Sequence, residues 1–508
     1  MESNKKGRTQ KAIKNIYYNI ANQMITLILS FVSRTVFIWG FGVQFLGING
    51  LFGDILSLLS MADLGFNTAM TYSYYKPLAN KDYNKIAELT TFYKKVYHCI
   101  AITITVIGLC LLPFLPVLIN LDNPVEHLNL YYLLSLSSVV VSYLCVYKTT
   151  VLMADQQGFL IAKVSMITNF IKTITQIISI ILWKNYVIYL LIGTIVSIGN
   201  NIYASHIASK LYPFINDNQC SITKEEKKDI FNNLGSVFLY KISSVLLNAT
   251  DNIIISMIIG TAMVGYYSNY LLLQTKITSI ISLIFTSMTS SVGNLIVMEK
   301  EKKRYEIFNC EQSISFIICG IVVPCYTLLV NDFIAVWLGD KFKLDIIVVL
   351  AIGLNMYLTC VLQPLWSYRE ATGLYKRTKW VMVICACLNI ILSVLLGYCF
   401  GLFGIIFASA LSRILTYVWI EPFILFKEYF SKSASRYYFE LIVNVILIIA
   451  IITITTCITS FIFVQSFVSW LFKALLVGFI SMFIVLIAYH KSDGVHILKS
   501  KIKNMLWK

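Results

Sequence analysis

Long apolar segments recur along the whole chain, and they limit the folds that are open to it. Each is about as long as the ~20 residues that an α-helix needs to cross a ~30 Å hydrocarbon core. Two of them lie within residues 15–75, joined by a turn at 40–50. The others lie at 96–119, 129–153, 160–182, 186–209, 232–258, 263–297, 308–337, 346–368, 379–400, 403–426, 440–463 and 467–489. We therefore predict an all-α polytopic membrane protein with 14 transmembrane helices.

The composition agrees with this class of protein. The chain is 58% hydrophobic and 13% charged, whereas a soluble domain averages about 45–50% apolar and ~25% charged residues. A net charge of +16 is typical of some nucleic-acid-binding proteins, but here the basic residues lie in short loops between apolar segments. The Cys and His residues show no metal-ligand spacing. We expect no nucleic-acid partner, no metal and no other cofactor.

The basic residues also predict the orientation of the chain. Alternate loops and both tails together hold 32 of the 41 Lys and Arg residues, and the loops between them hold only three. Cytoplasmic loops of membrane proteins carry an excess of Lys and Arg, so both termini are predicted to be cytoplasmic. In this scheme Arg369 belongs to a basic cytoplasmic loop at 369–379, and Lys473 lies near the outer end of its helix, with its ammonium reaching toward the membrane surface.

A weak internal repeat predicts two lobes. Shifting the chain by 218 residues aligns Gly42 with Gly260 and Gly47 with Gly265. Six helices separate the two copies, so both have the same orientation, which is typical of a parallel pseudo-twofold repeat. The predicted parts are a cytoplasmic basic tail at 1–14, an N-lobe at 15–209, a cytoplasmic linker at 210–231, a C-lobe at 232–427, two C-terminal helices at 440–489, and a cytoplasmic basic tail at 490–508.

Ionisable residues at membrane depth indicate where a substrate binds. Each costs about 2.5–3.5 kcal/mol on insertion scales, so such groups usually face a bundle interior or a wet cavity. The deep cations are Arg34, Lys172, Lys241, Lys276 and Arg413. The deep acids Asp63, Asp251 and Glu421 can neutralise only three of these five cations. We therefore expect an anionic substrate.

Uncharged polar residues follow the same helix faces at spacings of three and four. Two of the deep acids and four amide residues are the candidates for lining a cavity: Asp63, Asn67, Asn169, Gln176, Asn248 and Asp251. A structural interpretation stays open for each of them. Polar stripes often make helix–helix hydrogen bonds, worth about 0.6 kcal/mol each, and deep charges can form ion pairs within the bundle.

Short motifs in the first 100 residues point to a family. They are RTVFI at 34–38, FLGINGLF at 45–52, ILSLLS at 55–60, ADLG at 62–65, YSYYKPLAN at 72–80 and FYKK at 92–95. These motifs resemble the bacterial oligosaccharide flippases, the capsule and O-antigen repeat-unit exporters of the multidrug/oligosaccharidyl-lipid/polysaccharide exporter superfamily. The resemblance implies two six-helix lobes around a central cavity, often with two extra helices.

The same resemblance implies a substrate and a place. The substrate is an undecaprenyl-pyrophosphate-linked oligosaccharide, moved from the cytoplasmic to the outer leaflet of the bacterial plasma membrane. The five deep cations are then expected to hold the pyrophosphate, and Asp63 and Asp251 to hold those cations or to couple transport to an ion. Membrane lipids and other polysaccharide-assembly membrane proteins are the expected partners.

Three alternatives remain. A lipid II flippase shares the superfamily and a cationic cavity, although the motifs at 34–95 favour the capsule-type exporters. A multidrug/cation antiporter usually has twelve helices and an acidic cavity, whereas the deep charges here are mostly positive. A membrane polysaccharide polymerase or glycosyltransferase needs a large outer loop or a carboxylate cluster, and neither occurs in this sequence. There is also no Walker A motif. We expect a transporter that is not an enzyme.

Overall fold

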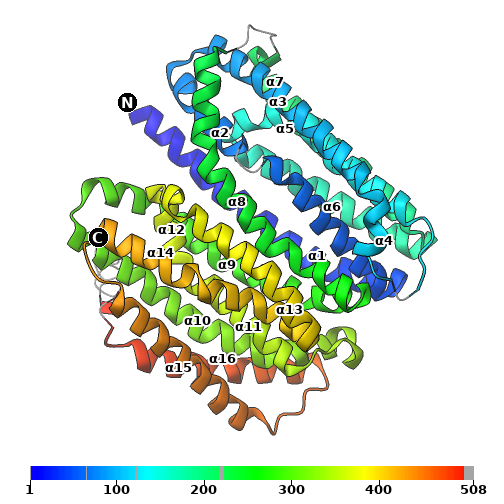
Figure 1. Ribbon diagram of the computed structural model, residues 1–508, viewed down its shortest axis with the longest axis vertical. Coiled ribbons are helices and arrows are strands. Elements are labelled where there is room, and N and C mark those ends of the chain that lie inside the picture. The colour runs from blue at the N-terminus through cyan, green and yellow to red at the C-terminus, as the bar shows by residue number, and fades with distance from the viewer. Residues whose placement is uncertain (1, 64–65, 122, 217–221, 493, 497–508) are drawn as a thin grey trace. The chain divides into compact units, whose positions relative to one another are not determined.

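The structure is a computed structural model that describes residues 2–63, 66–121, 123–216, 222–492 and 494–496 (Figure 1). Within these ranges the chain forms helices and no strand, which confirms the predicted all-α class. The chain divides into two compact units, Met1–Gly265 and Tyr266–Lys508. This division comes after helix α8 (Lys224–Ile258), which we predicted to open the second lobe. The division into lobes at the 210–231 linker stays a prediction.

The first unit is built from long helices with short connections. After α1 and a 3₁₀ turn at Ser60–Asp63 the chain continues through α2 to α8. The other bounds are α1 Glu2–Leu59, α2 Phe66–Asn80, α3 Tyr83–Cys110, α4 Leu115–Leu118, α5 Leu128–Ala154, α6 Gly158–Trp183 and α7 Tyr186–Leu211. Helix α7 packs on both α5 and α6, and α6 also packs on α1. These contacts bring the polar faces of α5, α6 and α7 together.

The second unit contains the remaining helices, and α9 begins just before the division. The bounds are α9 Thr261–Met298, α10 Glu301–Leu338, α11 Ile346–Val361, α12 Gln363–Thr372, α13 Tyr375–Leu415, α14 Tyr417–Leu425, α15 Ser435–Thr459 and α16 Phe467–Tyr489. A π-helical turn at Phe426–Phe430 follows α14. Helix α10 is the centre of this unit, because α11, α15 and α16 all pack on it.

Two glycines break helices that are otherwise continuous. Gly42 in α1 has φ 84°, and Gly401 in α13 has φ 58°. Only glycine adopts such positive φ values at little steric cost. The turn that we expected over 40–50 is therefore confined to the neighbourhood of Gly42, because the residues on both sides of it are helical.

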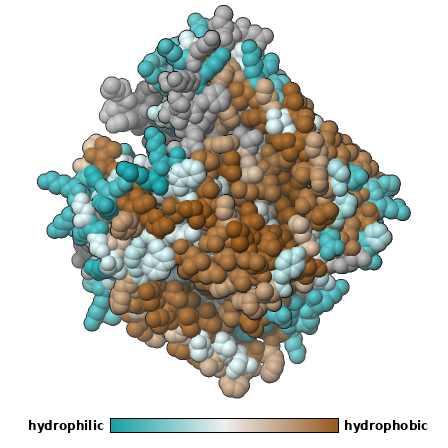
Figure 2. All heavy atoms as spheres, in the orientation of Figure 1, coloured by the Kyte–Doolittle hydropathy of each residue, from teal (hydrophilic) through white to brown (hydrophobic). Residues whose placement is uncertain are grey.

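Most of the helices are suited to a membrane. Among the described residues, ten helices are long and apolar enough to cross a bilayer, and the bent pair α11–α12 would make eleven. In the view of Figure 2, hydrophobic residues cover the helices of each unit, and hydrophilic residues gather toward the helix ends. The chain is thus a multi-pass membrane protein. The count of 14 helices stays a prediction.

The two C-terminal helices pack on the second unit through polar contacts as well as apolar ones. The Lys473 ammonium of α16 lies 2.7 Å from an Asp332 carboxylate oxygen of α10. One turn away, the Trp470 indole N–H donates to the Leu329 carbonyl oxygen at 3.2 Å. Our expectation that Lys473 reaches toward the membrane surface is therefore wrong, because α10 supplies a counter-ion beside it.

Candidate functional site

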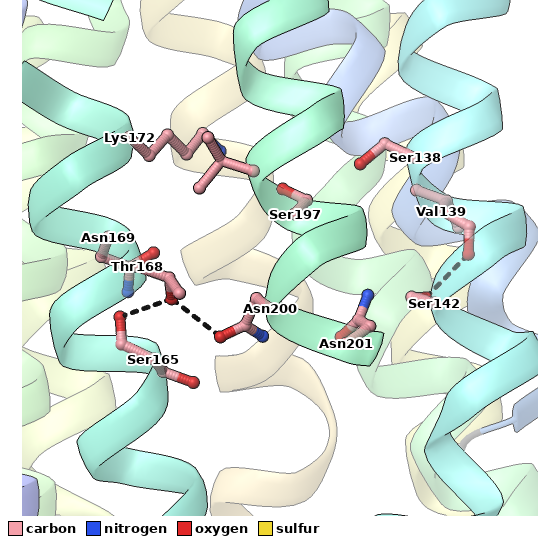
Figure 3. Close-up of a pocket in the computed structure, with 11 residues that line it drawn as sticks. Ser138, Val139, Ser142, Ser165, Thr168, Asn169, Lys172, Ser197, Asn200 and Asn201 are labelled. Carbon is pink, nitrogen blue, oxygen red and sulfur yellow. Dashed lines mark hydrogen bonds between the residues drawn. The ribbon is translucent and has the colours of Figure 1, made fainter. Parts of the chain in front are cut away.

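A polar pocket lies between α5, α6 and α7 of the first unit (Figure 3). Its volume is about 290 Å³. The residues that line it are Ser138, Val139, Ser142, Ser165, Thr168, Asn169, Lys172, Val196, Ser197, Asn200 and Asn201. All but two of them carry a hydroxyl, amide or ammonium group. Such a surface is unusual at membrane depth, where polar side chains face a partner or a wet cavity.

Helical spacing explains how these residues meet. On α6, Ser165, Asn169 and Lys172 follow one another at intervals of four and three, which places them on one helix face. On α7, Ser197 and Asn201 are likewise four residues apart. The side chain of Asn185 accepts hydrogen bonds from the amides of Val187 and Ile188, which caps the start of α7. The pocket is therefore a joint product of the stripes on its three helices.

Some of the pocket's polar groups have partners within the protein. The Thr168 hydroxyl donates to the Asn200 side-chain oxygen at 2.7 Å, which ties α6 to α7. The Ser142 hydroxyl donates to the Val139 carbonyl oxygen of its own helix at 2.7 Å. For the side chains of Asn201, Ser197 and Lys172, the described part of the chain offers no hydrogen-bond or ion-pair partner. These groups are available to a ligand.

The predicted residues Lys172 and Asn169 meet in this pocket, and Gln176 lies one turn beyond Lys172 on α6. Gln176 is buried, and its amide donates to the Tyr189 carbonyl oxygen of α7 at 3.0 Å. This bond positions α6 against α7, which is a structural role. Arg34 of α1 is half-buried, and its guanidinium interacts electrostatically with the Tyr189 side chain.

The other candidates of the first unit lie on α2 and α8. Asn67 is exposed, and its side-chain oxygen accepts a hydrogen bond from the Thr150 hydroxyl at 3.4 Å. On α8, Lys241 and Asp251 are half-buried, while Asn248 is exposed and donates to the Ser244 carbonyl oxygen of its own helix. Asp63 ends the 3₁₀ turn after α1, and its side chain lies outside the described part of the structure.

Two of the five predicted cations belong to the second unit. Lys276 is half-buried on α9. Arg413 on α13 is only 8% exposed, and it donates to the Thr359 hydroxyl at 3.2 Å. The gathering of all five cations around one cavity stays a prediction.

A buried ion pair in the second unit was not expected. One guanidinium nitrogen of Arg369, on α12, lies 2.9 Å and 3.2 Å from the two carboxylate oxygens of Glu421, on α14. Both residues are at most 7% exposed. Arg369 therefore belongs to α12, which follows α11 after a 40° bend, and not to the loop that we predicted to begin at residue 369. The cytoplasmic side of that loop stays a prediction.

The pocket residues of α5 and α7 were also missed by the sequence analysis. Ser138 and Ser142 lie four residues apart on α5, and Asn200 and Asn201 belong to the polar stripe of α7. The signal was present as helical spacing. It did not stand out because neither stripe contains a charged residue.

Comparisons with known proteins place the chain in a family. The family model described as "Polysaccharide biosynthesis protein" matches residues 59–347, which is more than half of the chain. A search of curated proteins finds no match.

Solved structures share the fold at low sequence identity. The lipid II flippase MurJ, in an inward closed conformation, is 16% identical with a TM-score of 0.65, and the match covers 94% of this chain and 99% of MurJ. An inward-facing multidrug resistance MATE family transporter of the MOP superfamily is 14% identical with a TM-score of 0.60, covering 79% of this chain and 96% of that one. The Vibrio cholerae MATE transporter VcmN is 15% identical with a TM-score of 0.53, covering 80% and 94%.

These solved structures are transporters and a flippase. Identities this low establish the shared fold. Together with the many apolar helices, the shared fold agrees with a multi-pass membrane protein. The chain belongs to the polysaccharide biosynthesis protein family and has the fold of the MOP superfamily.

Proposed function

We propose that this protein is a flippase for undecaprenyl-pyrophosphate-linked oligosaccharide repeat units, moving them from the cytoplasmic to the outer leaflet for capsule or O-antigen assembly. The observation that carries the proposal is the pocket around Lys172, where an ammonium group without a counter-ion among the described residues lies among hydroxyl and amide groups. An ammonium group attracts phosphate, and the neighbouring polar groups can bind sugar hydroxyls.

In this proposal the predicted residues have distinct roles. The headgroup cations are Arg34, Lys172, Lys241, Lys276 and Arg413. Asn67, Asn169, Gln176 and Asn248 contact sugars or shape the cavity, and Asp63 and Asp251 hold the cations or couple transport to an ion. The lipid tail stays in the bilayer throughout. Rocking of one lobe against the other around a central cationic cavity then gives alternating access.

The proposed topology has 14 crossings with both termini in the cytoplasm of a bacterium. The 35-residue α8 adds a twelfth crossing to the eleven apolar segments. The helix breaks at Gly42 and Gly401 each divide one long helix into two crossings, which gives 14. The concentration of Lys and Arg in alternate loops supports the orientation.

A reciprocal contact inside the first unit supports the two-lobe repeat. A methyl group added at Gly47 would lie 2.0 Å from the Thr261 carbonyl oxygen, and one added at Gly265 would lie 2.2 Å from the Val43 carbonyl oxygen. Under the 218-residue shift, Gly47 corresponds to Gly265 and Val43 to Thr261. The shift therefore maps each of the two contacts onto the other. Such reciprocal contacts are typical of a twofold axis.

Deletion of the gene tests the proposed function. We expect complete lipid-linked repeat units to accumulate on the cytoplasmic side, as measured with a membrane-impermeant sugar probe. Accumulation of single units on the outer side without polymer would indicate a lost polymerase and would contradict the proposal. Normal export by Arg34→Ala and Lys172→Ala variants, at wild-type abundance, would contradict the assignment of the cations.

A lipid II flippase is the second candidate function, favoured by the MurJ match over 94% of this chain. The same deletion distinguishes the two candidates. Accumulated lipid with the sugar composition of a surface polysaccharide supports our proposal, whereas accumulated lipid with peptide-bearing peptidoglycan precursor supports the second candidate.

A further inference from the structure

We infer that the pocket between α5, α6 and α7 binds the single sugar ring that is joined directly to the phosphate of the substrate. Lys172 contacts that phosphate, and Asn201 and Ser197 bind hydroxyl groups of the ring. This inference rests on the proposed function, and it adds the part of the substrate that the pocket selects.

The chemistry of the lining matches a sugar better than a lipid tail. Only Val139 and Val196 present apolar side chains to the pocket. An asparagine amide both donates and accepts hydrogen bonds, and so does a serine hydroxyl. The side chains of Asn201 and Ser197 have no hydrogen-bond partner in the described part of the chain, so their donors and acceptors are open to sugar hydroxyls, which also do both.

The charge of the pocket places the phosphate at one end. Lys172 is the only charged residue among the lining residues, and Figure 3 shows it at one end of the group, with Ser165 and Asn201 toward the other. Lys172 and Ser165 are seven residues apart on α6, or about 10 Å along the helix axis. A ligand with an anionic end and an uncharged polyol end fits a pocket that is charged at one end and uncharged but polar at the other.

The volume limits how much of the substrate can enter. About 290 Å³ is at the lower limit of small-molecule sites, which occupy ~300–1,000 Å³. The pocket therefore has room for one ring and its phosphate, and the distal sugars of a repeat unit must lie outside it. Selection at this pocket would act on the first sugar.

Binding of defined lipids to the purified full-length protein in nanodiscs tests the inference. The probes are undecaprenyl pyrophosphate without sugar and the same lipid carrying one glucose, galactose or N-acetylglucosamine. We expect the wild type to bind at least one sugar-bearing lipid about tenfold more tightly than the sugar-free lipid, as two or so net hydrogen bonds would give. The double variant Ser197→Ala/Asn201→Ala should bind both with the affinity of the sugar-free lipid, and Lys172→Met should weaken both equally.

Thr175→Ala is the matched control, because Thr175 is half-buried on α6, outside the pocket, and its hydroxyl donates to the Ile171 carbonyl oxygen of its own helix. It should retain the wild-type preference, with all variants compared at equal abundance and elution volume. A wild type without a sugar preference, or a double variant that retains it, overturns the inference. If the wild type binds none of these pyrophosphate lipids, the proposed function itself fails.

Discussion

Lys172 in the first unit and Arg369 in the second are both cations on helices that could cross a membrane, but their surroundings are opposite. Arg369 is 7% exposed and paired with Glu421. Lys172 is half-buried beside a polar pocket and has no acidic partner among the described residues. The comparison shows that a cation on a membrane-capable helix does not by itself identify a binding site. A cation that already has a counter-ion stabilises the fold, and one without a counter-ion can attract an anion.

The difference has a physical basis in desolvation. Burying a charge costs several kcal/mol, and a well-placed opposite charge offsets that cost. Arg369 and Glu421 meet this condition together. For Lys172 the neighbouring hydroxyl and amide groups and water reduce the cost, so the ammonium can exchange those neighbours for a phosphate.

The largest effect on stability should follow removal of Glu421. A Glu421→Ala variant leaves the Arg369 guanidinium buried without this carboxylate, and we expect it to lower the free energy of unfolding by about 3–5 kcal/mol. Thermal unfolding of the purified protein measures this loss. Glu440→Ala is the control, because the Arg436–Glu440 pair is exposed, and it should cost about 0–1 kcal/mol. Equal melting temperatures for the two variants would contradict the structural role of Glu421.

A smaller loss is expected at the pair that anchors α16. Lys473 and Asp332 retain side-chain exposures of 15% and 26%, so water partly solvates both charges. Removing this charged hydrogen bond by Asp332→Ala should cost about 1.5–3 kcal/mol. Hydrogen exchange should become faster in α16 than in α15. A double variant Asp332→Leu/Lys473→Met should recover most of the loss, and continued fast exchange in it would argue against this explanation.

The pair Lys85–Glu226 should contribute less, and its contribution should depend on pH. Lys85 holds the pKa of Glu226 below the ordinary value of 4.5, first of all by donating a hydrogen bond to its carboxylate. A lowered pKa in the folded state stabilises the protein above the ordinary value, and the contribution is lost as pH falls below 4.5.

Because the Glu226 side chain is 42% exposed, the effect should be at most about 1 kcal/mol. We expect Glu226→Gln to lower the melting temperature slightly at pH 7 and not at all at pH 3. A difference that grows as the pH falls would have the wrong sign for this ion pair.

The smallest effect on stability is expected at Lys172, where the functional effect should be large. Lys172→Met removes a charge that has no counter-ion within the described ranges of the chain, so the free energy of unfolding should stay the same or rise. Export should fall, as measured by accumulation of lipid-linked oligosaccharide on the cytoplasmic side. Lys163→Met is the control, because Lys163 is exposed on the same helix, outside the pocket. A Lys172 variant that is unstable but exports normally would reverse the comparison between the two cations.

Much of this protein could be predicted from residue order alone. Segments of about 20 apolar residues require helices in a membrane, because only helices and closed barrels satisfy their own backbone there. Helical spacing also identified Asn169, Lys172 and Gln176 as neighbours on one face of α6, and the glycines of the repeated turn stood out at a constant shift. These features depend on short-range geometry, which a sequence displays directly.

The partners of each polar face were decided only by the tertiary structure. Spacing shows which residues share a face of one helix, but it does not show which helix that face meets. The sequence predicted a loop at Arg369, whereas in the structure the bend between α11 and α12 brings Arg369 to Glu421. We expected the Lys473 ammonium to reach the membrane surface, whereas in the structure it pairs with Asp332 of α10. Asn200 and Asn201 joined Lys172 because α7 packs on α6. Whether a cation is neutralised or open to a substrate depends on contacts between residues far apart in the chain.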